Sequence, residues 1–417
     1  MTRSSSGLFK TAQSSLTHST SAETRAKKCI VASPSNVFET NLARVRQRRH
    51  SFSVCQQATL SDSAVHAKKS ALGSRRHRNR YSHCKIIASG SYGNVFLCWD
   101  RVLCTHVAIK YFKCDPETDF VEYDELCEIE MLKTVSPHQN LIALLDVLGP
   151  NRILKGDSLL AIAMPYFVAG TLRTYGDLYT SGAFSTGRKK VSSMPVPLVR
   201  RFSRQLYSVL SHLHKHRVVH CDLKPDNILI DVVENKIVLC DFGMAQTMHI
   251  DKETPFRHFV ADGVLCTLWY RPPEALLWRR TMTEKFDLWS AALIVAEMLC
   301  GYALFRGQDT NNQMTMILET LGTPSEAEWP DLRKSFKWDS EWGSFKGTGL
   351  STFIADSHGL AFVQEMLVCN PKKRPGTQEA LQHAFLDTKA CEAARHTLPR
   401  LPLKVAENLS FHTCKTE

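Results

Sequence analysis

The sequence contains no apolar run long enough to cross a membrane. The longest candidate extends from Ala291 to Phe305, is interrupted by Glu297, and predicts a core helix followed by its end. The first residues also lack the apolar segment of a secretory signal. We therefore expect no membrane partner.

Closely spaced cysteine pairs are also absent. The chain has 14 cysteines, and none follows another at the CxxC spacing that is common in zinc sites and dithiol enzymes. Several of them, including Cys240 and Cys300, fall in predicted core elements, where a thiol packs like a small apolar side chain. We therefore expect a reducing compartment, no disulfide framework and no zinc site.

Acidic residues are scarce in residues 1–80, which contain 15 Lys and Arg but only 3 Asp and Glu, a formal charge of +12. The rest of the chain contains 37 Lys and Arg and 38 Asp and Glu, so it is nearly neutral. The basic character therefore belongs to an N-terminal extension, which we expect to be disordered because it is polar and has no sustained period. A contact with nucleic acid is expected only through this extension.

Two basic clusters, at residues 44–50 and 75–80, leave three interpretations of the extension open. It could be a solvated tail, a nuclear-import signal or a mitochondrial presequence. For the whole protein we expect the nucleus and/or the cytoplasm. At the other end, residues 387–417 form a tail of mixed composition with no clear period.

Residues 217–243 hold two carboxylates and an amide at a spacing that suits phosphoryl transfer from ATP. This reaction needs one carboxylate to accept the proton of the attacking hydroxyl and two oxygen ligands to hold Mg²⁺ near the phosphates. Asp222 fits the first role, and Asn227 with Asp241 fits the second. Lys224 is placed to neutralise charge on the group in transfer.

Three further elements precede this segment. Residues 88–95 (ASGSYGNV) are rich in glycine, which allows a backbone to approach phosphates closely. Lys110 ends a strand-like run, VAIK, and Glu128 follows 18 positions later in a helical stretch. We expect Lys110 to pair with the α- and β-phosphates and Glu128 to hold Lys110 in position.

Together these motifs resemble the Gly-rich loop, catalytic loop and DFG segment of eukaryotic protein kinases. The resemblance implies an α+β, bilobal fold in residues 81–386, with a small β-rich N-lobe (about 81–165) and a larger, mainly helical C-lobe (about 166–386). It implies ATP and Mg²⁺ as cofactors and protein substrates as partners. The residues that it implies for ATP binding are Ala88, Gly90, Ser91, Tyr92, Gly93, Val95, Ala108, Lys110, Met164, Tyr166, Phe167, Asn227 and Asp241.

Within that set, Met164 matches the family's gatekeeper position, and Tyr166 and Phe167 match the hinge beside adenine. Two positions depart from the family pattern. Ala88 replaces the first glycine of the Gly-rich loop, and Cys221 replaces the arginine of the His-Arg-Asp motif.

Later segments resemble the group that contains cyclin-dependent and MAP kinases, and the cyclin-dependent kinases most closely. Residues 267–274 read TLWYRPPE, and residues 321–330 contain LGTP followed by EWP. Lys224 marks the Ser/Thr type, and Thr267 is implied to hydrogen-bond Asp222 and Lys224.

The same resemblance gives two arginines a role. Arg271 goes with Ser-Pro and Thr-Pro targets in this group, so we expect a proline-directed serine/threonine protein kinase. Arg374 is implied to pair with Glu274 as a structural lock.

Active cyclin-dependent kinases hold an activation-loop phosphothreonine with three arginines, because a phosphate of nearly two negative charges needs such a cluster. In this chain the three arginine positions are Cys127, Cys221 and Gln246, and the threonine position is Asp262. We hypothesise that loop phosphorylation at this site is not used. The alternative for Asp262 is an ordinary solvated loop acid.

The helix that faces a cyclin in this family is expected over residues 122–128, where Leu126 is an apolar residue that could contact such a partner. A cyclin-type activating subunit is therefore a candidate partner. Three other interpretations of the chain stay open: a Dbf-dependent-type replication kinase, a monomeric kinase that activates cyclin-dependent kinases, and a catalytically inactive scaffold.

Hydrophobic periodicity and stop signals predict the main elements. Residues 159–164 are expected to form the last N-lobe strand, and residues 176–195 a surface insert. Helices are expected at 198–214, 286–300, 360–367 and 379–385.

Overall fold

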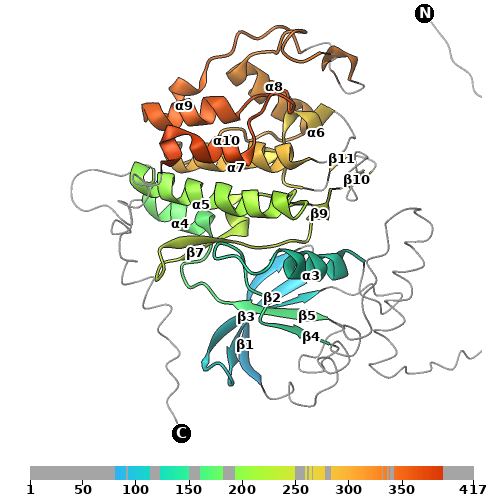
Figure 1. The fold of residues 1–417 in the computed structure, drawn as a ribbon, viewed down its shortest axis with the longest axis vertical. Helices are drawn as coiled ribbons and strands as arrows, with labels where there is room; N and C mark the ends of the chain where they lie inside the picture. The colour runs from blue at the N-terminus through green and yellow to red at the C-terminus, as the bar shows by residue number, and fades with distance from the viewer. Residues whose placement is uncertain are drawn as a thin grey trace, which may run out of the picture.

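The computed structural model describes residues 80–90, 93–112, 123–149, 160–181, 193–248, 259–260, 263–264, 266–277, 283–330, 332–335, 338 and 342–387. These residues form two lobes, with the β-rich lobe at the bottom of Figure 1 and the helical lobe above it. The predicted α+β, bilobal fold is therefore confirmed. Residues 1–79 and 388–417, with the predictions made for them, lie outside the described residues.

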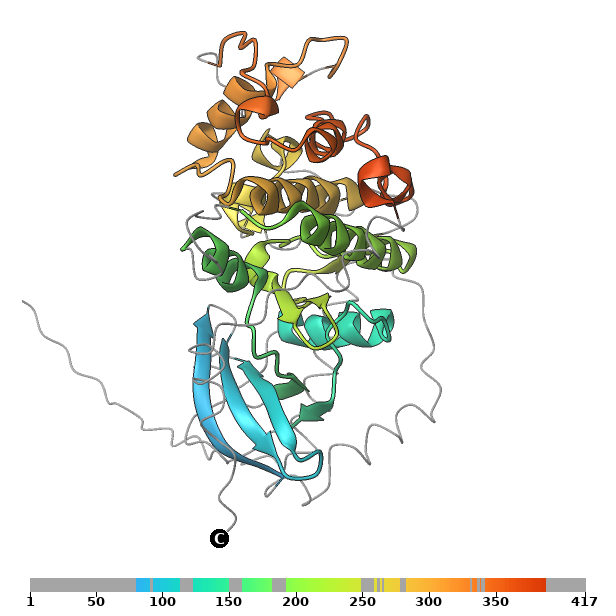
Figure 2. The same ribbon diagram turned by 90° about the vertical axis from the view of Figure 1, so that its left-hand side faces the viewer.

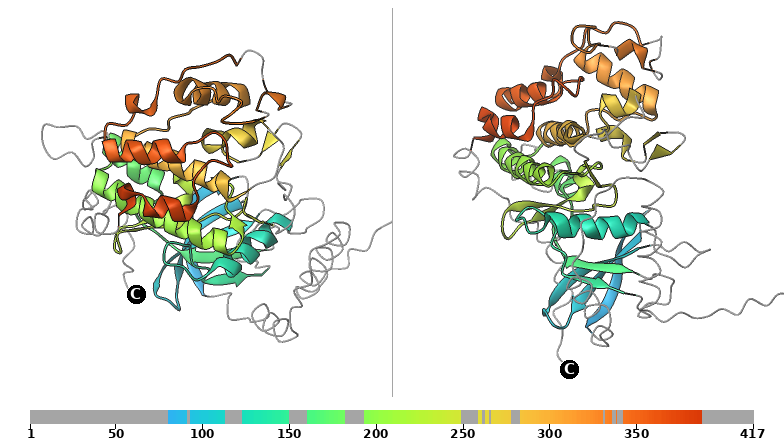
Figure 3. Two further views of the ribbon diagram at one scale, coloured as in Figure 1. Left: turned by 45° about the horizontal axis from the view of Figure 1, so that its top comes forward. Right: turned by 45° about the vertical axis from the view of Figure 1, so that its right-hand side comes forward.

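The small lobe is built on an antiparallel five-stranded sheet with the order β1-β2-β3-β5-β4. Its elements are β1 (Tyr81–Gly90), β2 (Gly93–Asp100), β3 (Thr105–Phe112), α3 (Tyr123–Val135), β4 (Asp146–Leu148) and β5 (Ala161–Pro165). The strands curl strongly in Figure 2, and in Figure 3 α3 lies between the sheet and the helical lobe. Buried side chains that include Cys98, Val107 and Ile109 form the core of the sheet.

The large lobe is mainly helical. Its helices are α4 (Leu172–Thr180), α5 (Val196–Lys215), α6 (Pro273–Leu277), α7 (Glu284–Cys300), α8 (Thr310–Leu321), α9 (Ser357–Met366) and α10 (Thr377–Gln382). Its short strands are β6 (Val218–Val219), β7 (Ile228–Asp231), β8 (Lys236–Leu239), β9 (Gln246–Thr247), β10 (Phe259–Val260) and β11 (Gly263–Val264). Helices α5 and α7 pack together at the centre of the lobe (Figure 3).

Helix α7 illustrates how the sequence defines these elements. The Thr283 side chain accepts a hydrogen bond from the backbone amide of Lys285 and caps the first turn. Almost every following side chain is buried, as expected of a helix that is apolar on all sides. The helix ends at Gly301, whose φ of 89° is readily adopted only by a residue without a Cβ.

Most sequence predictions agree with the observed elements to within a few residues, and two are wrong. The predicted insert at 176–195 begins with five helical residues, because α4 extends to Thr180. The predicted helix at 379–385 is two pieces: α10 stops at Gln382 and a separate 3₁₀ turn covers Ala384–Leu386. His383 divides them because it takes an extended backbone conformation, with φ −63° and ψ 139°.

The sequence analysis expected no disulfide framework, and it did not anticipate the one disulfide that the described residues contain. Cys84 on β1 and Cys98 on β2 are joined by a disulfide, with their Cα atoms 4.3 Å apart. Composition could not reveal this pairing, because it depends on how two neighbouring strands are aligned.

Candidate active site

Lys110 of β3 lies at the centre of a buried ion-pair network between the lobes. Its Nζ is 2.9 and 2.8 Å from the two carboxylate oxygens of Glu128 on α3, and 2.9 Å from Oδ1 of Asp241. The alignment of β3 with its neighbours places Lys110 opposite Val95 on β2 and Ile162 on β5. Three segments far apart in the sequence thus meet at one amine.

Burial and charge oppose each other in this network. Burial alone would lower the pKa of Lys110, but the attraction of Glu128 and Asp241 outweighs it and raises that pKa above its ordinary value. For Asp241 burial favours a higher pKa, but Lys110 lowers it. Burial raises the pKa of Glu128, although Lys110 counteracts the increase. Lys110 and Asp241 are therefore both charged near neutral pH.

The catalytic-loop residues form a second network. Lys224 Nζ lies 2.7 Å from Oδ2 of Asp222 and 3.1 Å from Oγ1 of Thr267. The backbone amide of Thr267 donates to Oδ1 of Asp222 at 3.0 Å, and Asn227 Nδ2 donates to the Asp222 carbonyl oxygen at 2.8 Å. Thr267 therefore reaches Lys224 through its hydroxyl and Asp222 through its backbone. Both oxygens of the Asp222 carboxylate are held in a fixed direction.

Asp287 on α7 anchors this loop, a role that the sequence analysis missed. Its carboxylate accepts hydrogen bonds from the backbone amides of His220 at 2.9 Å and Cys221 at 3.0 Å. It also lies 3.0 Å from Nε2 of His214. Asp287 is fully buried, and a buried acid needs such partners. A single acid in the otherwise apolar run FDLWSAAL could therefore have indicated this anchoring role from the sequence. The ring of His220 in turn contacts the carbonyl oxygen of Cys240 at 3.0 Å and ties the catalytic loop to the strand before Asp241.

The glycine-rich hairpin joins β1 and β2. Gly90 pairs with Gly93, and Ala88 pairs with Val95, while Ser91 and Tyr92 lie outside the described residues. Gly93 has a φ of 150°, and a Cβ there would lie 2.0 Å from the carbonyl oxygen of Tyr111. Only glycine fits at position 93 because β3 packs so closely against it.

The residues expected to touch adenine lie where the lobes meet. Ala108 on β3 pairs with Met164 on β5, and both are buried or half-buried. Tyr166 and Phe167 follow β5 directly and are half-buried, with Phe167 packed against the main core. Two residues of the predicted ATP set, Ala108 and Met164, are thus direct neighbours on adjacent strands.

Asn227 and Asp241 are suited to hold Mg²⁺. The Asn227 amide nitrogen is bonded to Asp222, so the side chain can offer its oxygen to a cation. Among the described residues no group of three or more His, Cys, Asp or Glu side chains could hold a metal ion by itself. This donor set fits Mg²⁺, which takes one or two protein oxygens and completes its shell with phosphates and water.

Beside the polar loop lies an apolar cluster that includes Cys221, one of the three positions where cyclin-dependent kinases carry an arginine. Cys221 is fully buried and packs with Val219, Met244, Cys266 and Phe286. Cys127 and Gln246 are also buried, at 5% and 1% exposure. Asp262 lies outside the described residues.

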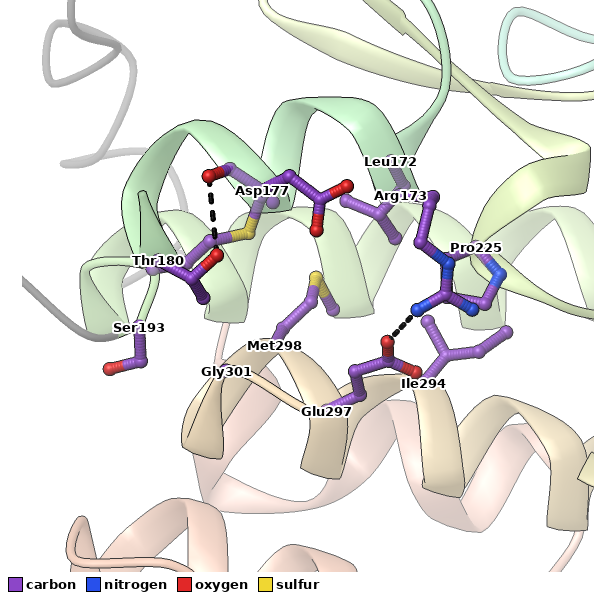
Figure 4. Close-up of a pocket in the computed structure, with 12 residues that line it drawn as sticks. Leu172, Arg173, Asp177, Thr180, Ser193, Pro225, Ile294, Glu297, Met298 and Gly301 are labelled. Atoms are coloured by element: carbon purple, nitrogen blue, oxygen red, sulfur yellow. Dashed lines mark hydrogen bonds and ion pairs between the residues drawn. The ribbon is translucent and has the colours of Figure 1, made fainter. Parts of the chain in front are cut away.

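Arg173 on α4 joins a further charged group to the catalytic loop (Figure 4). It contacts the Glu297 carboxylate, donates to the Tyr270 hydroxyl at 2.6 Å, and lies 3.3 Å from Asp226. The Tyr270 hydroxyl donates to Glu297 at 2.6 Å. A pocket lined by Leu172, Ile294 and Met298 lies next to this group, below α4 in Figure 4.

The predicted lock between Arg374 and Glu274 is present. Two guanidinium nitrogens of Arg374 lie 2.9 and 3.0 Å from the two carboxylate oxygens of Glu274. Arg374 is 1% exposed, and its guanidinium lies 5.0 Å from the centre of the Trp289 ring. This bidentate pair fixes the segment after Thr267 to the end of the lobe.

Comparison with known families agrees with this geometry. The model of the protein kinase domain matches residues 81–386 of this chain. No helix in the part of the chain that the structure describes is long and apolar enough to span a membrane.

The family match covers most of the chain. The chain therefore belongs to the protein kinase domain family, and it is a protein kinase, an ATP-binding phosphotransferase.

Proposed function

We propose that this protein kinase transfers the γ-phosphate of ATP to serine and threonine hydroxyls of proteins, with a preference for a following proline. The observation that carries the proposal is the complete network of Asp222, Lys224 and Thr267. Lys224 in the DLKPDN segment supports Ser/Thr specificity, because it resembles that class of kinase. The likeness to cyclin-dependent kinases supports the proline preference.

Each residue of the site has a distinct part in the proposed reaction. Asp222, held by the amide of Thr267, accepts the proton of the attacking hydroxyl. Lys224 lies beside Asp222 and offsets negative charge on the transferring phosphoryl group. Lys110, oriented by Glu128, binds the α- and β-phosphates.

Asn227 and Asp241 would hold Mg²⁺, which would supply positive charge to neutralise the phosphates. The Lys110–Asp241 contact of 2.9 Å brings the phosphate-binding amine and the metal-binding carboxylate to the same point. The protein's contribution is therefore positioning and fixed charge, which is most of what phosphoryl transfer requires.

The proposed kinase does not depend on a phosphate in its activation loop. The three positions that would supply arginines are buried and uncharged, and Cys221 belongs to an apolar cluster. The Lys110–Glu128 pair is already formed in the single chain. This supports activity without a cyclin-type subunit. The side chain of Leu126, the apolar residue that could contact such a subunit, is instead partly buried against the chain's own core.

The proline preference has one local support. Arg271 is 8% exposed, and its guanidinium donates to the carbonyl oxygen of Cys266 at 2.6 Å. It thereby fixes the backbone just before Thr267, on the segment that a substrate's next residue meets in this kinase group. Cys266 is itself buried among apolar side chains of the large lobe, which holds this backbone in place.

The test is phosphate transfer from Mg-ATP by the purified chain to matched Ser-Pro and Ser-Ala peptides, with Asp222→Asn as the control. We expect transfer that the control loses and that favours Ser-Pro. Equal rates on both peptides would remove the proline preference. ATP binding without transfer in any condition would favour the scaffold interpretation.

A further inference from the structure

The disulfide between Cys84 and Cys98 crosslinks the two strands that carry the glycine-rich hairpin. The cysteines are separated by 14 positions, and residues 88–95 lie inside the ring that the bond closes. In the described part of the chain, this is the only pair of cysteines that is joined. Its place on the nucleotide-binding hairpin makes it a candidate for control of that hairpin.

The strand register explains why these two thiols meet. β1 and β2 pair regularly from Ala88–Val95 to Gly90–Gly93, but the register shifts between Ser82 and Lys85. This irregularity is a β-bulge, which re-aims the side chain that it contains. Cys84 lies within the bulge and packs against the small-lobe core, where Cys98 is fully buried.

The two sulfurs differ in access. Cys98 has no exposed surface, whereas Cys84 is only partly buried. Cys84 also lies on the edge strand of the sheet, close to exposed Ile86 and Ile87. A solute can therefore reach Cys84 first, and Cys98 is held behind it as a resolving thiol.

We propose that Cys84 and Cys98 are a reversible thiol–disulfide site that controls nucleotide exchange in the glycine-rich hairpin. The inference rests on the proposed function only in that the hairpin must bind ATP and ADP. The co-reactant is a small-molecule disulfide of the glutathione class. Reduction of the bond by the corresponding thiol reverses the control.

The exchange balances in two steps. In the first, the Cys84 thiolate attacks one sulfur of glutathione disulfide, forms a mixed disulfide and releases one glutathione thiolate. In the second, the Cys98 thiolate attacks Sγ of Cys84, forms the internal disulfide and releases the second glutathione thiolate. The two cysteine protons pass through solvent to the two released thiolates, so two thiols are oxidised and one disulfide is reduced.

The consequence follows from the position of the bond. With the bond formed, β1 cannot separate from β2, and β2 is paired along its length with β3, the strand that carries Lys110. The hairpin must move away from the phosphates to release ADP, and loop opening of this kind often limits turnover. Oxidation therefore slows release of ADP, and reduction restores it.

The experiment measures the dissociation rate of a fluorescent ADP analogue with Mg²⁺ from the full chain. The protein is equilibrated with either glutathione disulfide or reduced glutathione, and intact mass reports the loss of two hydrogen atoms on oxidation. We expect dissociation at least about threefold slower in the oxidised form. Cys84→Ser should release the analogue at the fast rate in both buffers.

Cys104→Ser is the matched control, because Cys104 is an exposed cysteine in the turn between β2 and β3 and lies outside the pair. This variant should keep the full redox response. Equal dissociation rates for the oxidised and reduced chain, or a response that survives Cys84→Ser, would overturn the inference. If no form binds the analogue, the proposed function itself fails, an outcome distinct from equal rates.

Discussion

Two neighbouring residues of the catalytic loop lie in opposite environments. Asp222 is surrounded by polar groups: the Lys224 amine, the Thr267 amide and the Asn227 side chain. Cys221 points into a cluster of sulfur-containing and apolar side chains. The chain thus has the polar contacts around the proposed base. It has none of the three arginines that cyclin-dependent kinases carry at positions 127, 221 and 246.

The difference separates two tasks that this fold combines in cyclin-dependent kinases. Positioning of the base uses hydrogen bonds within residues 222–267 and the anchoring of the loop backbone by Asp287, and none of these contacts uses the side chain at position 221. Sensing of a loop phosphate would need cations at positions 127, 221 and 246, and none is there. We infer that the polar side carries catalysis and that the apolar side stabilises the activation segment by burial instead of by charge.

The largest expected effect comes from breaking the polar side. Asp222→Asn removes the proposed proton acceptor but keeps the hydrogen-bonding shape. We expect kcat to fall by about 10³-fold with little change in ATP affinity, because general-base catalysis contributes about 10²–10⁴-fold. Peptide phosphorylation and ATP titration measure the two quantities, and a variant that retained near-normal kcat would remove Asp222 from its role.

Breaking the apolar side should cost stability. Cys221→Arg places a cation in a site with no exposed surface, and a buried charge without a partner costs about 3–5 kcal/mol. We expect a clearly lower thermal-unfolding midpoint for this variant, while Cys221→Ala, the matched control, stays close to the parent. A Cys221→Arg protein as stable as the parent would show that the site still accommodates an arginine.

Weakening the ion pair between Lys110 of β3 and Glu128 of α3 should give an intermediate effect. Glu128→Gln leaves Lys110 with Asp241 as its remaining charged contact, and hydrogen bonds to charged groups are worth about 1.5–3 kcal/mol. We therefore expect kcat/KM for ATP to fall about 10- to 100-fold. Glu130→Gln, on an exposed position of the same helix, should change it little; equal losses in both variants would assign the effect to α3 as a whole.

The smallest effect is expected at the activation loop. Because positions 127, 221 and 246 carry no positive charge, Asp262 has none of the arginines that would pair with a charge at that position. Asp262→Ala should therefore change peptide phosphorylation by less than about twofold, since a single ion pair outside a network contributes little. A large loss would give Asp262 the role of a fixed substitute for phosphate.

The sequence predicted the parts of this molecule that depend on local patterns. The order of the motifs predicted both lobes, and the helix predicted at 286–300 ends at the same residue as α7. The pairing of Lys110 with Glu128 also agreed with the expected spacing. The missed features depend on tertiary packing: the Cys84–Cys98 pair needs a register shift between strands, and the anchoring by Asp287 needs a helix to lie below the loop.

The most direct test of the account compares phosphate transfer by the purified full chain before and after phosphatase treatment, with the loss of all phosphate verified by mass. The account predicts transfer from Mg-ATP to a Ser-Pro peptide at the same rate in both samples, and its loss in Asp222→Asn. Transfer that phosphatase abolishes, or its absence from both samples, would contradict a kinase that works without a loop phosphate.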